Sequence, residues 1–453
     1  MDLASQRSHL VLYTTATCNL KCVYCYIDKN PALVKIDNAL DESFKGDYYF
    51  DFARKMFPDQ NQLQCVEFWG GEPTLRLDRA YYTVEKLIGF YPSLDSFFMS
   101  TNFTGDNWYD QFGGFIKMLQ KFKNRKFFFN LQLSLDGPAY INDAQRGRGV
   151  TKKFRQHFEK WIDMMNEMLS IPDNNVKIVG QFKPTLTSDL IHKLIEKKEN
   201  IIEYYQFFDE YKDYFETHIK VNKDNADLYL TIPNTACPSP HTQQDGIDFT
   251  KFCEYCRDII IENNNGAGYF KYFQTLMPFK PRYAVDYDSR SYCQSCGACG
   301  SGRSVVGLLP YDYISTCHNG FVNLITEYKK ESMKNKNTAL DFRLFMDQSD
   351  YMTRTIESYK QYEKNVAFAY DGCSSLKLGN IASMISLLGK NNQIDPKYAN
   401  PREAQKAALF IQAATAYCFR DNVAMTGSSG LFHVGLLKLL LNGAREVIES
   451  ENV

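Results

Sequence analysis

Short apolar runs alternate with longer amphipathic stretches from residue 8 to about residue 230. Each run has the length of a β-strand, and the stretches between runs have the spacing of apolar residues typical of helices. We identify six runs, at residues 10–13, 65–69, 96–101, 127–135, 176–182 and 202–208. This repeated order predicts βα units around a parallel sheet, and therefore an α/β fold with a six-stranded partial barrel.

The pattern changes after residue 230. Residues 235–240, which read Thr-Ala-Cys-Pro-Ser-Pro, are typical of a loop at a domain boundary. A segment rich in cysteine follows, and helical patterns then continue to the end of the chain. The sequence therefore predicts three domains: a partial barrel over 8–230, a cysteine-rich domain over 231–375 and a helical extension over 376–453.

Composition narrows the class of protein. Of the 453 residues, 44% are hydrophobic and 23% are charged, as in ordinary globular proteins. The 52 basic residues nearly balance the 53 acidic ones, so no overall field attracts nucleic acid or an anionic membrane. The first residues lack a signal-peptide pattern, and no uncharged apolar run could span a bilayer. We expect a cytoplasmic protein with neither kind of partner. In that reducing compartment, the 13 cysteines favour metal ligation over disulfides.

Three of these cysteines follow the first apolar run at close spacing. Cys18, Cys22 and Cys25 can hold three irons of a [4Fe–4S] cluster and leave the fourth iron without a protein ligand. A zinc site would normally add a fourth Cys or His nearby, and no histidine occurs between His9 and His157. Zinc, or a chance group of free cysteines, is the weaker alternative.

Polar and glycine-containing segments end the next three runs. Gly70, Gly71 and Glu72 follow the second run, where glycine permits close approach of a ligand and a carboxylate accepts hydrogen bonds from an ammonium group. Alone, these residues could form only a tight turn. Asn102 follows the third run, and capping of a turn is an equal alternative for it.

The fourth run ends in Ser134-Leu135-Asp136-Gly137-Pro138, and Arg146 follows. A serine hydroxyl and a guanidinium suit a carboxylate and a ribose. Arg148 is an equally placed competitor for Arg146. At the end of the predicted sixth strand, Gln206 and Asp209 are candidate substrate contacts, although solvated polar residues are the simpler interpretation.

The cysteine spacing CxxxCxφC, with Tyr24 as the aromatic φ, resembles the signature of the radical S-adenosylmethionine (SAM) enzymes. The resemblance implies that the open iron chelates the amino and carboxylate groups of SAM, and that the reduced cluster cleaves SAM to a 5′-deoxyadenosyl radical. It implies a SAM site formed by Tyr24, Gly70, Gly71, Glu72, Asn102, Ser134 and Arg146. The chain departs from the family at Phe103, where the family often has glycine.

Further cysteines form a second group beyond residue 230. A Cys₄ ligand set is available from Cys293, Cys296, Cys299 and Cys317, with zinc as the alternative to iron–sulfur. Eight cysteines in all could hold one or two auxiliary [4Fe–4S] clusters: Cys237, Cys253, Cys256, Cys293, Cys296, Cys299, Cys317 and Cys373.

Residues 299–317 resemble the start of the SPASM or twitch domains of radical SAM peptide maturases, which carry a hairpin between cysteines. The chain is similar in this respect to anaerobic sulfatase-maturing enzymes. It departs from them at Asp312, which replaces the usual glycine, and it lacks the downstream cysteine set. The resemblance implies a ribosomal precursor peptide as substrate, modified by crosslinking, epimerisation or oxidation, and an electron donor such as flavodoxin or ferredoxin.

Two alternatives remain open at this point. One is a radical SAM enzyme that acts on a small molecule or nucleoside, and the other is a non-catalytic iron–sulfur sensor or scaffold. The basic stretch 117–126 could suggest RNA, but we interpret it as the exposed end of a helix that leads into the fourth strand.

Overall fold

The structure is a computed structural model. It describes residues 8–25, 27, 32–230, 234–236, 305–311 and 314–315, and the single positions 248, 251, 252, 255, 259, 269 and 271. The predicted segments 231–375 and 376–453 lie almost wholly outside the described residues, so their boundaries stay predictions. No helix in the described part of the chain is long and apolar enough to cross a membrane.

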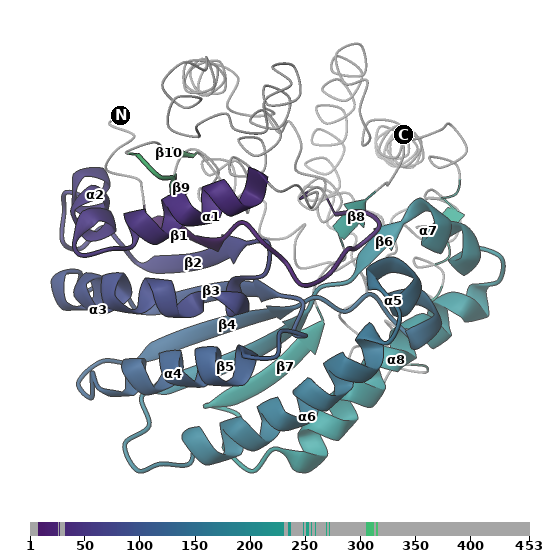
Figure 1. The fold of residues 1–453 in the computed structure, drawn as a ribbon. Helices are drawn as coiled ribbons and strands as arrows, with labels where there is room; N and C mark the ends of the chain where they lie inside the picture. Colours follow the sequence, from purple (N-terminus) through teal and green to yellow (C-terminus); the bar gives the residue numbers. More distant parts are fainter. Residues whose placement is uncertain are drawn as a thin grey trace, which may run out of the picture.

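One eight-stranded sheet organises the described chain (Figure 1). Its strand order is β10-β9-β1-β2-β3-β4-β5-β7, and all neighbours are parallel except β9 and β10. The strands are β1 (His9–Thr15), β2 (Cys65–Gly70), β3 (Ser96–Thr101), β4 (Phe127–Leu133), β5 (Val176–Phe182), β7 (Ala226–Leu230), β9 (Val305–Leu308) and β10 (Ile314–Ser315). The predicted α/β fold with a parallel sheet is confirmed.

The connections between the strands are helical. They are α1 (Ala32–Ser43), α2 (Tyr48–Met56), α3 (Tyr81–Phe90), α4 (Trp108–Gln120), α5 (Ala139–Arg146), α6 (Val150–Met168), α7 (Ser188–Leu194) and α8 (Lys198–His218), with short 3₁₀ turns η2 (Pro73–Leu75) and η3 (Leu77–Ala80). A two-stranded pair, β6 (Thr185–Thr187) with β8 (Asn234–Ala236), lies apart from the main sheet. β9 comes from the predicted cysteine-rich segment, yet it pairs with β1, and with β10 it forms the hairpin expected between residues 299 and 317.

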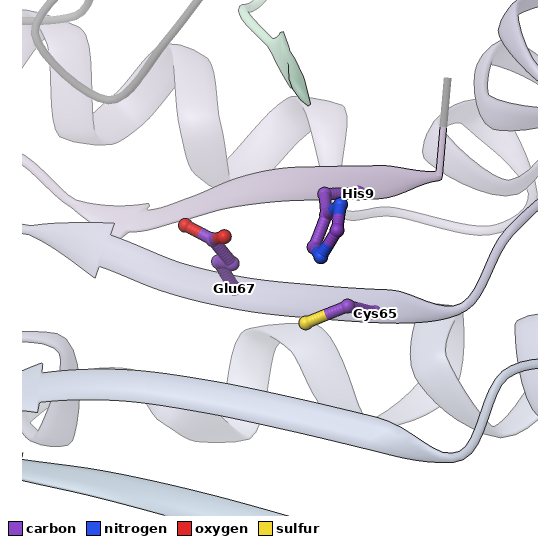
Figure 2. Close-up of side chains that lie close together, drawn as sticks. All are labelled: His9, Cys65 and Glu67. Atoms are coloured by element: carbon purple, nitrogen blue, oxygen red, sulfur yellow. The ribbon is translucent and has the colours of Figure 1, made fainter. Parts of the chain in front are cut away.

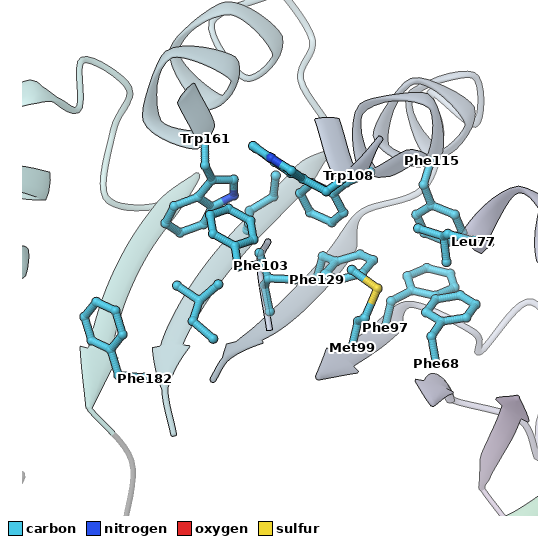
Figure 3. Close-up of a cluster of buried hydrophobic side chains, with 14 of the residues drawn as sticks. Phe68, Leu77, Phe97, Met99, Phe103, Trp108, Phe115, Phe129, Trp161 and Phe182 are labelled. Atoms are coloured by element: carbon cyan, nitrogen blue, oxygen red, sulfur yellow. The ribbon is translucent and has the colours of Figure 1, made fainter. Parts of the chain in front are cut away.

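Alternation along the strands divides the sheet into two faces. On one face, aromatic rings from neighbouring strands stack: Phe97 and its register partner Phe129 have centroids 6.2 Å apart, and Phe68, diagonal to Phe97, has its centroid 6.4 Å from that ring. Phe115 of α4 meets Phe68 edge-on at 5.2 Å (Figure 3). Each fully buried ring contributes about 2 kcal/mol of apolar transfer free energy, so this face fixes the helices onto the sheet.

The opposite face of the sheet, which we call the polar face, carries the alternate residues. Gln132 donates to Ser100 across β4 and β3 at 2.8 Å, and Gln181 donates to Asn130 across β5 and β4 at 2.5 Å. Such side chains are rare in a packed apolar core, because each needs a hydrogen-bond partner. The polar face is therefore the side of the sheet suited to a polar ligand.

One predicted strand is wrong. Residues 202–208 lie within helix α8, and β7 supplies the sixth strand of the parallel series. The buried side chains of α8 follow helical spacing, with Tyr204, Phe208, Tyr211 and Phe215 on one face. A short dense apolar run fits either kind of element, and here the packing of its buried side chains selects a helix. Consequently Gln206 and Asp209 are not at a strand end. The side-chain amide of Gln206 donates to the carbonyl of Tyr269, and the carboxylate of Asp209 accepts from the N–H of Lys271.

The basic stretch 117–126 is confirmed as the exposed end of α4 and the turn after it. Lys117, Lys121, Lys123 and Lys126 are exposed, whereas Arg125 donates to the carbonyls of Ile88, Tyr91, Pro92 and Leu94. Arg125 therefore satisfies the backbone of the loop between α3 and β3.

We expect Arg125→Ala to lower the free energy of unfolding by about 2 kcal/mol, because hydrogen bonds from a charged group to several carbonyls are lost. Arg125→Lys should recover little of this, since an ammonium cannot match the planar fork. Urea unfolding measures the effect. Lys126→Ala, on the exposed neighbour, is the control, and equal stability of the two alanine variants would contradict the assignment.

Candidate active site

Cys18, Cys22 and Cys25 lie on the cysteine loop (residues 16–25), which follows β1 at the carboxyl edge of the sheet. Their charges influence one another, yet their sulfur atoms do not form a set within 4.8 Å, unlike one other trio in the described part of the chain. One zinc ion with bonds of about 2.3 Å would draw its thiolates to about 3.8 Å from each other.

Polar groups already surround the sulfur of Cys18. The backbone N–H of Leu20 donates to it at 3.4 Å, and the side-chain amide of Asn102 donates at 3.5 Å. Burial nevertheless raises the pKa of Cys18 to about 12, and the nearby Glu72 adds to the rise. Burial also raises the pKa of Cys22, and the Arg146 charge opposes it. Burial therefore disfavours the thiolate form of both cysteines.

The end of β2 packs directly under the cysteine loop. A Cβ atom on Gly71 would lie 2.0 Å from the carbonyl oxygen of Thr17, and one on Gly70 would lie 2.0 Å from that of Thr15. The N–H of Gly71 donates to Thr15 at 3.0 Å, and that of Glu72 donates to Thr17 at 2.9 Å. The two glycines thus permit close approach of the chain's own loop, a reason beyond the ligand approach for which we singled them out.

Glu72 is almost fully buried and accepts four hydrogen bonds. Its Oε1 accepts from the backbone and hydroxyl of Thr74 and from the hydroxyl of Thr101, and its Oε2 accepts from the N–H of Asn102 at 2.6 Å. Burial raises the pKa of Glu72, and the four donors oppose the rise. Oε2 keeps acceptor capacity for one further donor, such as an ammonium group.

Asn102 both caps a turn and contacts the cysteine loop. Its Oδ1 accepts from the backbone and hydroxyl of Thr104 at 2.9 and 2.7 Å, which is the capping role considered from sequence. Its Nδ2 donates to Cys18 and, at 2.9 Å, to Asn19. The two interpretations are therefore compatible, because each uses a different end of the amide.

Phe103 keeps the backbone conformation that favours glycine. Its φ is 59°, in the left-handed region that costs a non-glycine residue free energy. The Phe103 ring is buried, with its centroid 4.4 Å from that of Trp108 and 5.6 Å from that of Phe154. Nδ1 of His157 forms a hydrogen bond of 2.9 Å with the Phe103 carbonyl oxygen. Aromatic packing thus compensates for the strained turn that the missing glycine would have made easily.

Arg146 and Tyr24 meet at a residue to which sequence reasoning gave no role, Asp136. Arg146 donates to both carboxylate oxygens of Asp136, at 2.8 and 2.7 Å, and the Tyr24 hydroxyl donates at 2.7 Å. Asp136 is fully buried and also accepts from the N–H of Thr185 at 2.9 Å. Burial alone would lower the pKa of Arg146, but the neighbouring Asp136 raises it, so the guanidinium keeps its charge. The SLDGP aspartate was visible in the sequence, but its partners were not.

Two other candidates differ in exposure. Ser134 is partly exposed, and its hydroxyl has no hydrogen-bond partner in the described structure, so it is free for a ligand. Arg148 is exposed, whereas its competitor Arg146 is buried beside the cysteine loop. The structure therefore brings Arg146, and not Arg148, into the network that supports Tyr24.

A second buried pair, absent from the sequence reasoning, supports the start of the cysteine loop. Arg79 donates to Asp37 at 2.8 Å and to the carbonyl of Thr14 at 2.7 Å. Asp37 also accepts from the hydroxyl of Thr15 at 2.9 Å and from the N–H of Ala16 at 3.2 Å. No motif marks these residues, because the contact joins α1 and η3 across the fold.

No family model matches the chain, and no curated protein matches its sequence. The chain is similar in structure to proteins solved with bound AdoMet. For anSMEcpe with bound AdoMet, the TM-score is 0.43 at 16% identity, covering 88% of this chain and 99% of that one. For the same protein with bound AdoMet and the Cp18Cys peptide, the TM-score is 0.41 at 17% identity, and the match again covers 88% of this chain and 99% of that one. Streptococcus suis SuiB bound to S-adenosylmethionine gives 0.31 at 15%, covering 69% and 58%.

The predicted ligands of the auxiliary clusters all lie outside the described residues. They are Cys237, Cys253, Cys256, Cys293, Cys296, Cys299, Cys317 and Cys373. Their assignment stays a prediction from the sequence.

Gly71→Ala should displace the cysteine loop, because the added methyl overlaps the Thr17 carbonyl and neither backbone can move alone. We expect the variant to fold but to retain much less iron after anaerobic reconstitution, as measured by iron analysis. Gly89→Ala, at a helical glycine with open space around its Cβ position, is the control. Normal iron retention by Gly71→Ala would show that the close approach is not needed.

Asp136→Asn should lower the free energy of unfolding by about 3–5 kcal/mol, because Arg146 is left buried without a countercharge. The paired variant Asp136→Asn/Arg146→Gln should recover part of that loss, giving a coupling free energy in a double-mutant cycle. Denaturant unfolding of the four proteins measures it. Additive effects would mean that the pair does not act as a unit.

Proposed function

We propose that the chain is a radical SAM enzyme with a partial (β/α)₆ barrel. The observation that carries the proposal is the convergence of three strand ends on the cysteine loop. β2 contributes Glu72, bonded to Thr17; β3 contributes Asn102, bonded to Cys18; and the segment after β4 contributes Asp136, bonded to Tyr24. Ligands bind at this carboxyl edge in parallel α/β sheets.

In this proposal Cys18, Cys22 and Cys25 hold a [4Fe–4S] cluster. SAM is held beside it by Gly70, Gly71, Glu72, Asn102, Ser134 and Arg146, with Tyr24 next to the cluster. The free acceptor capacity of Glu72 and the free hydroxyl of Ser134 support this assignment. When bound, the reduced cluster supplies the electron that cleaves SAM to a 5′-deoxyadenosyl radical.

The chain's own residues then position rather than react. Glu72 accepts from an ammonium group, and its four existing donors hold the carboxylate in one orientation. Asn102 donates to the sulfur of Cys18, which stabilises the thiolate. Asp136 and Arg146 fix Tyr24, and hence the end of the loop that carries Cys25. Such pre-organisation directs a reactive species to one substrate hydrogen.

The substrate in our proposal is a peptide, modified by crosslinking, epimerisation or oxidation, and a flavodoxin or ferredoxin supplies electrons. This rests on the resemblance of residues 299–317 to the start of the auxiliary domains of peptide maturases. The β9–β10 hairpin, which lies within the second segment, supports it. One or two auxiliary clusters held by the cysteines beyond residue 230 would bind substrate or accept the electron left after hydrogen abstraction.

The anaerobically reconstituted and reduced protein should convert SAM to 5′-deoxyadenosine and methionine, measured by liquid chromatography. Alanine at Cys18, Cys22 and Cys25 together should abolish the conversion, since no iron remains open to SAM. Gly89→Ala, at a helical glycine with open space around its Cβ position, is the control and should cleave SAM normally. Cleavage of SAM by the triple variant would contradict the assignment of these three cysteines as cluster ligands. A wild-type chain that binds clusters without cleaving SAM would instead favour the non-catalytic iron–sulfur sensor.

Iron analysis of the triple alanine variant tests the auxiliary clusters. Four irons per cube predict about eight irons per chain if two auxiliary clusters are present, and about four if there is one. Zinc in place of iron, or loss of all iron, would refute the auxiliary-cluster assignment while leaving the SAM site untouched.

A further inference from the structure

A histidine, a cysteine and a glutamate meet at the opposite edge of the sheet from the cysteine loop. His9 opens β1 and Cys65 opens β2, and the two are direct partners in the parallel register. Glu67 lies two residues beyond Cys65, so its side chain leaves β2 on the same face. Figure 2 shows the three side chains gathered on that face of the two strands. It is the polar face, because the intervening Leu10 and Val66 belong to the apolar core.

The three ligand atoms are close enough for one metal ion. One nitrogen of His9, the sulfur of Cys65 and one carboxylate oxygen of Glu67 all lie within 4.8 Å of one another. A tetrahedral ion with bonds of about 2.0–2.3 Å needs ligand atoms about 3.3–3.8 Å apart. Small rotations of the side chains would close this difference without movement of the strands.

Neighbouring side chains already form hydrogen bonds with two of the three ligands, His9 and Glu67. The hydroxyl of Ser8 lies 2.9 Å from Nδ1 of His9, which leaves Nε2 for a metal. The indole N–H of Trp69 donates to Oε2 of Glu67 at 3.1 Å, which leaves Oε1. Metal-binding histidines and carboxylates usually carry such hydrogen bonds on the atom that does not bind the ion.

Within the described residues, no ion pair balances the charge of the trio. In the described structure Glu67 forms no ion pair, and Cys65 is a buried free thiol without a hydrogen-bond partner. A carboxylate and a thiolate together carry the two negative charges that neutralise a divalent cation. Imidazole, thiolate and carboxylate are together the ligand types of zinc, whereas magnesium and calcium take oxygen ligands only.

We propose that His9, Cys65 and Glu67 bind one divalent transition-metal ion of the zinc type. The ion joins the amino-terminal ends of β1 and β2, and three protein ligands leave its fourth position to water. The site is separate from the cysteine loop: the seven residues of β1 separate the two edges by roughly 20 Å. It stands whether or not the chain cleaves SAM.

Zinc binding to the full-length chain, prepared anaerobically, tests the site. The parent should bind one more equivalent of Zn²⁺ than each of the variants His9→Gln, Cys65→Ser and Glu67→Gln. If a variant still binds this additional Zn²⁺, its Kd should be at least tenfold higher than that of the parent. Thiols elsewhere contribute equally to all four proteins, so the difference isolates the trio. Ser96→Ala is the matched control, because Ser96 extends the same register row in β3 and should leave zinc binding unchanged.

Two further readouts keep the test decisive. Co²⁺ in place of Zn²⁺ should give a thiolate-to-cobalt absorption that is lost in Cys65→Ser. Zn²⁺ should also raise the Tm of the parent and of Ser96→Ala, but not that of His9→Gln or Glu67→Gln. If Cys65→Ser fails to fold by circular dichroism, the two partly exposed positions carry the comparison. Equal zinc stoichiometry and affinity in the parent and in the His9 and Glu67 variants would overturn the proposal.

Discussion

The buried carboxylate of Asp136 is the interaction on which the candidate site depends. It joins the end of β4, helix α5, the cysteine loop and the start of β6 through Arg146, Tyr24 and the Thr185 N–H. A charge without water is costly unless every lone pair finds a donor, so these segments are held in one arrangement. The loop is thereby placed by charge satisfaction rather than by apolar packing.

Two more carboxylates, Asp37 through its Oδ1 and Glu72 through both oxygens, accept hydrogen bonds around the same loop. Asp37 pairs with Arg79 and bonds the loop's first residues, while Glu72 is held by neutral hydroxyl and amide donors only. The difference has a chemical consequence. Asp37 and Asp136 already have a guanidinium, whereas Glu72 has no cation in the described structure and can take one from a ligand. This contrast separates the carboxylates that support the site from the one suited to bind an ammonium group.

The two faces of the sheet explain why such a polar site is stable. Stacked rings on one face, from Phe68 through Phe97 to Phe129, supply the apolar burial that holds the helices. The polar face is then free to carry glutamine, asparagine and the His9 trio without loss of the core. Phe103 combines apolar packing and polar contacts locally. The packing of its ring compensates for a strained turn, and this turn places the Asn102 side chain beside Cys18.

Sequence by itself determined the features that follow from local pattern. Five of the six predicted strands, the α/β class, the exposed helix end at 117–126 and the placement of cysteines and polar motifs at strand ends all rest on periodicity and spacing. Tertiary structure decided the rest. Residues 202–208 are apolar enough for either a strand or a helix, and only the packing of Tyr204 and Phe208 against their neighbours selects α8. The partners of Asp136, the support from Arg79 and the meeting of His9 with Glu67 join positions far apart in the chain, and no local preference encodes such contacts. They arise because parallel pairing brings distant segments to a common edge, where burial makes each charged or ligating side chain depend on its neighbours.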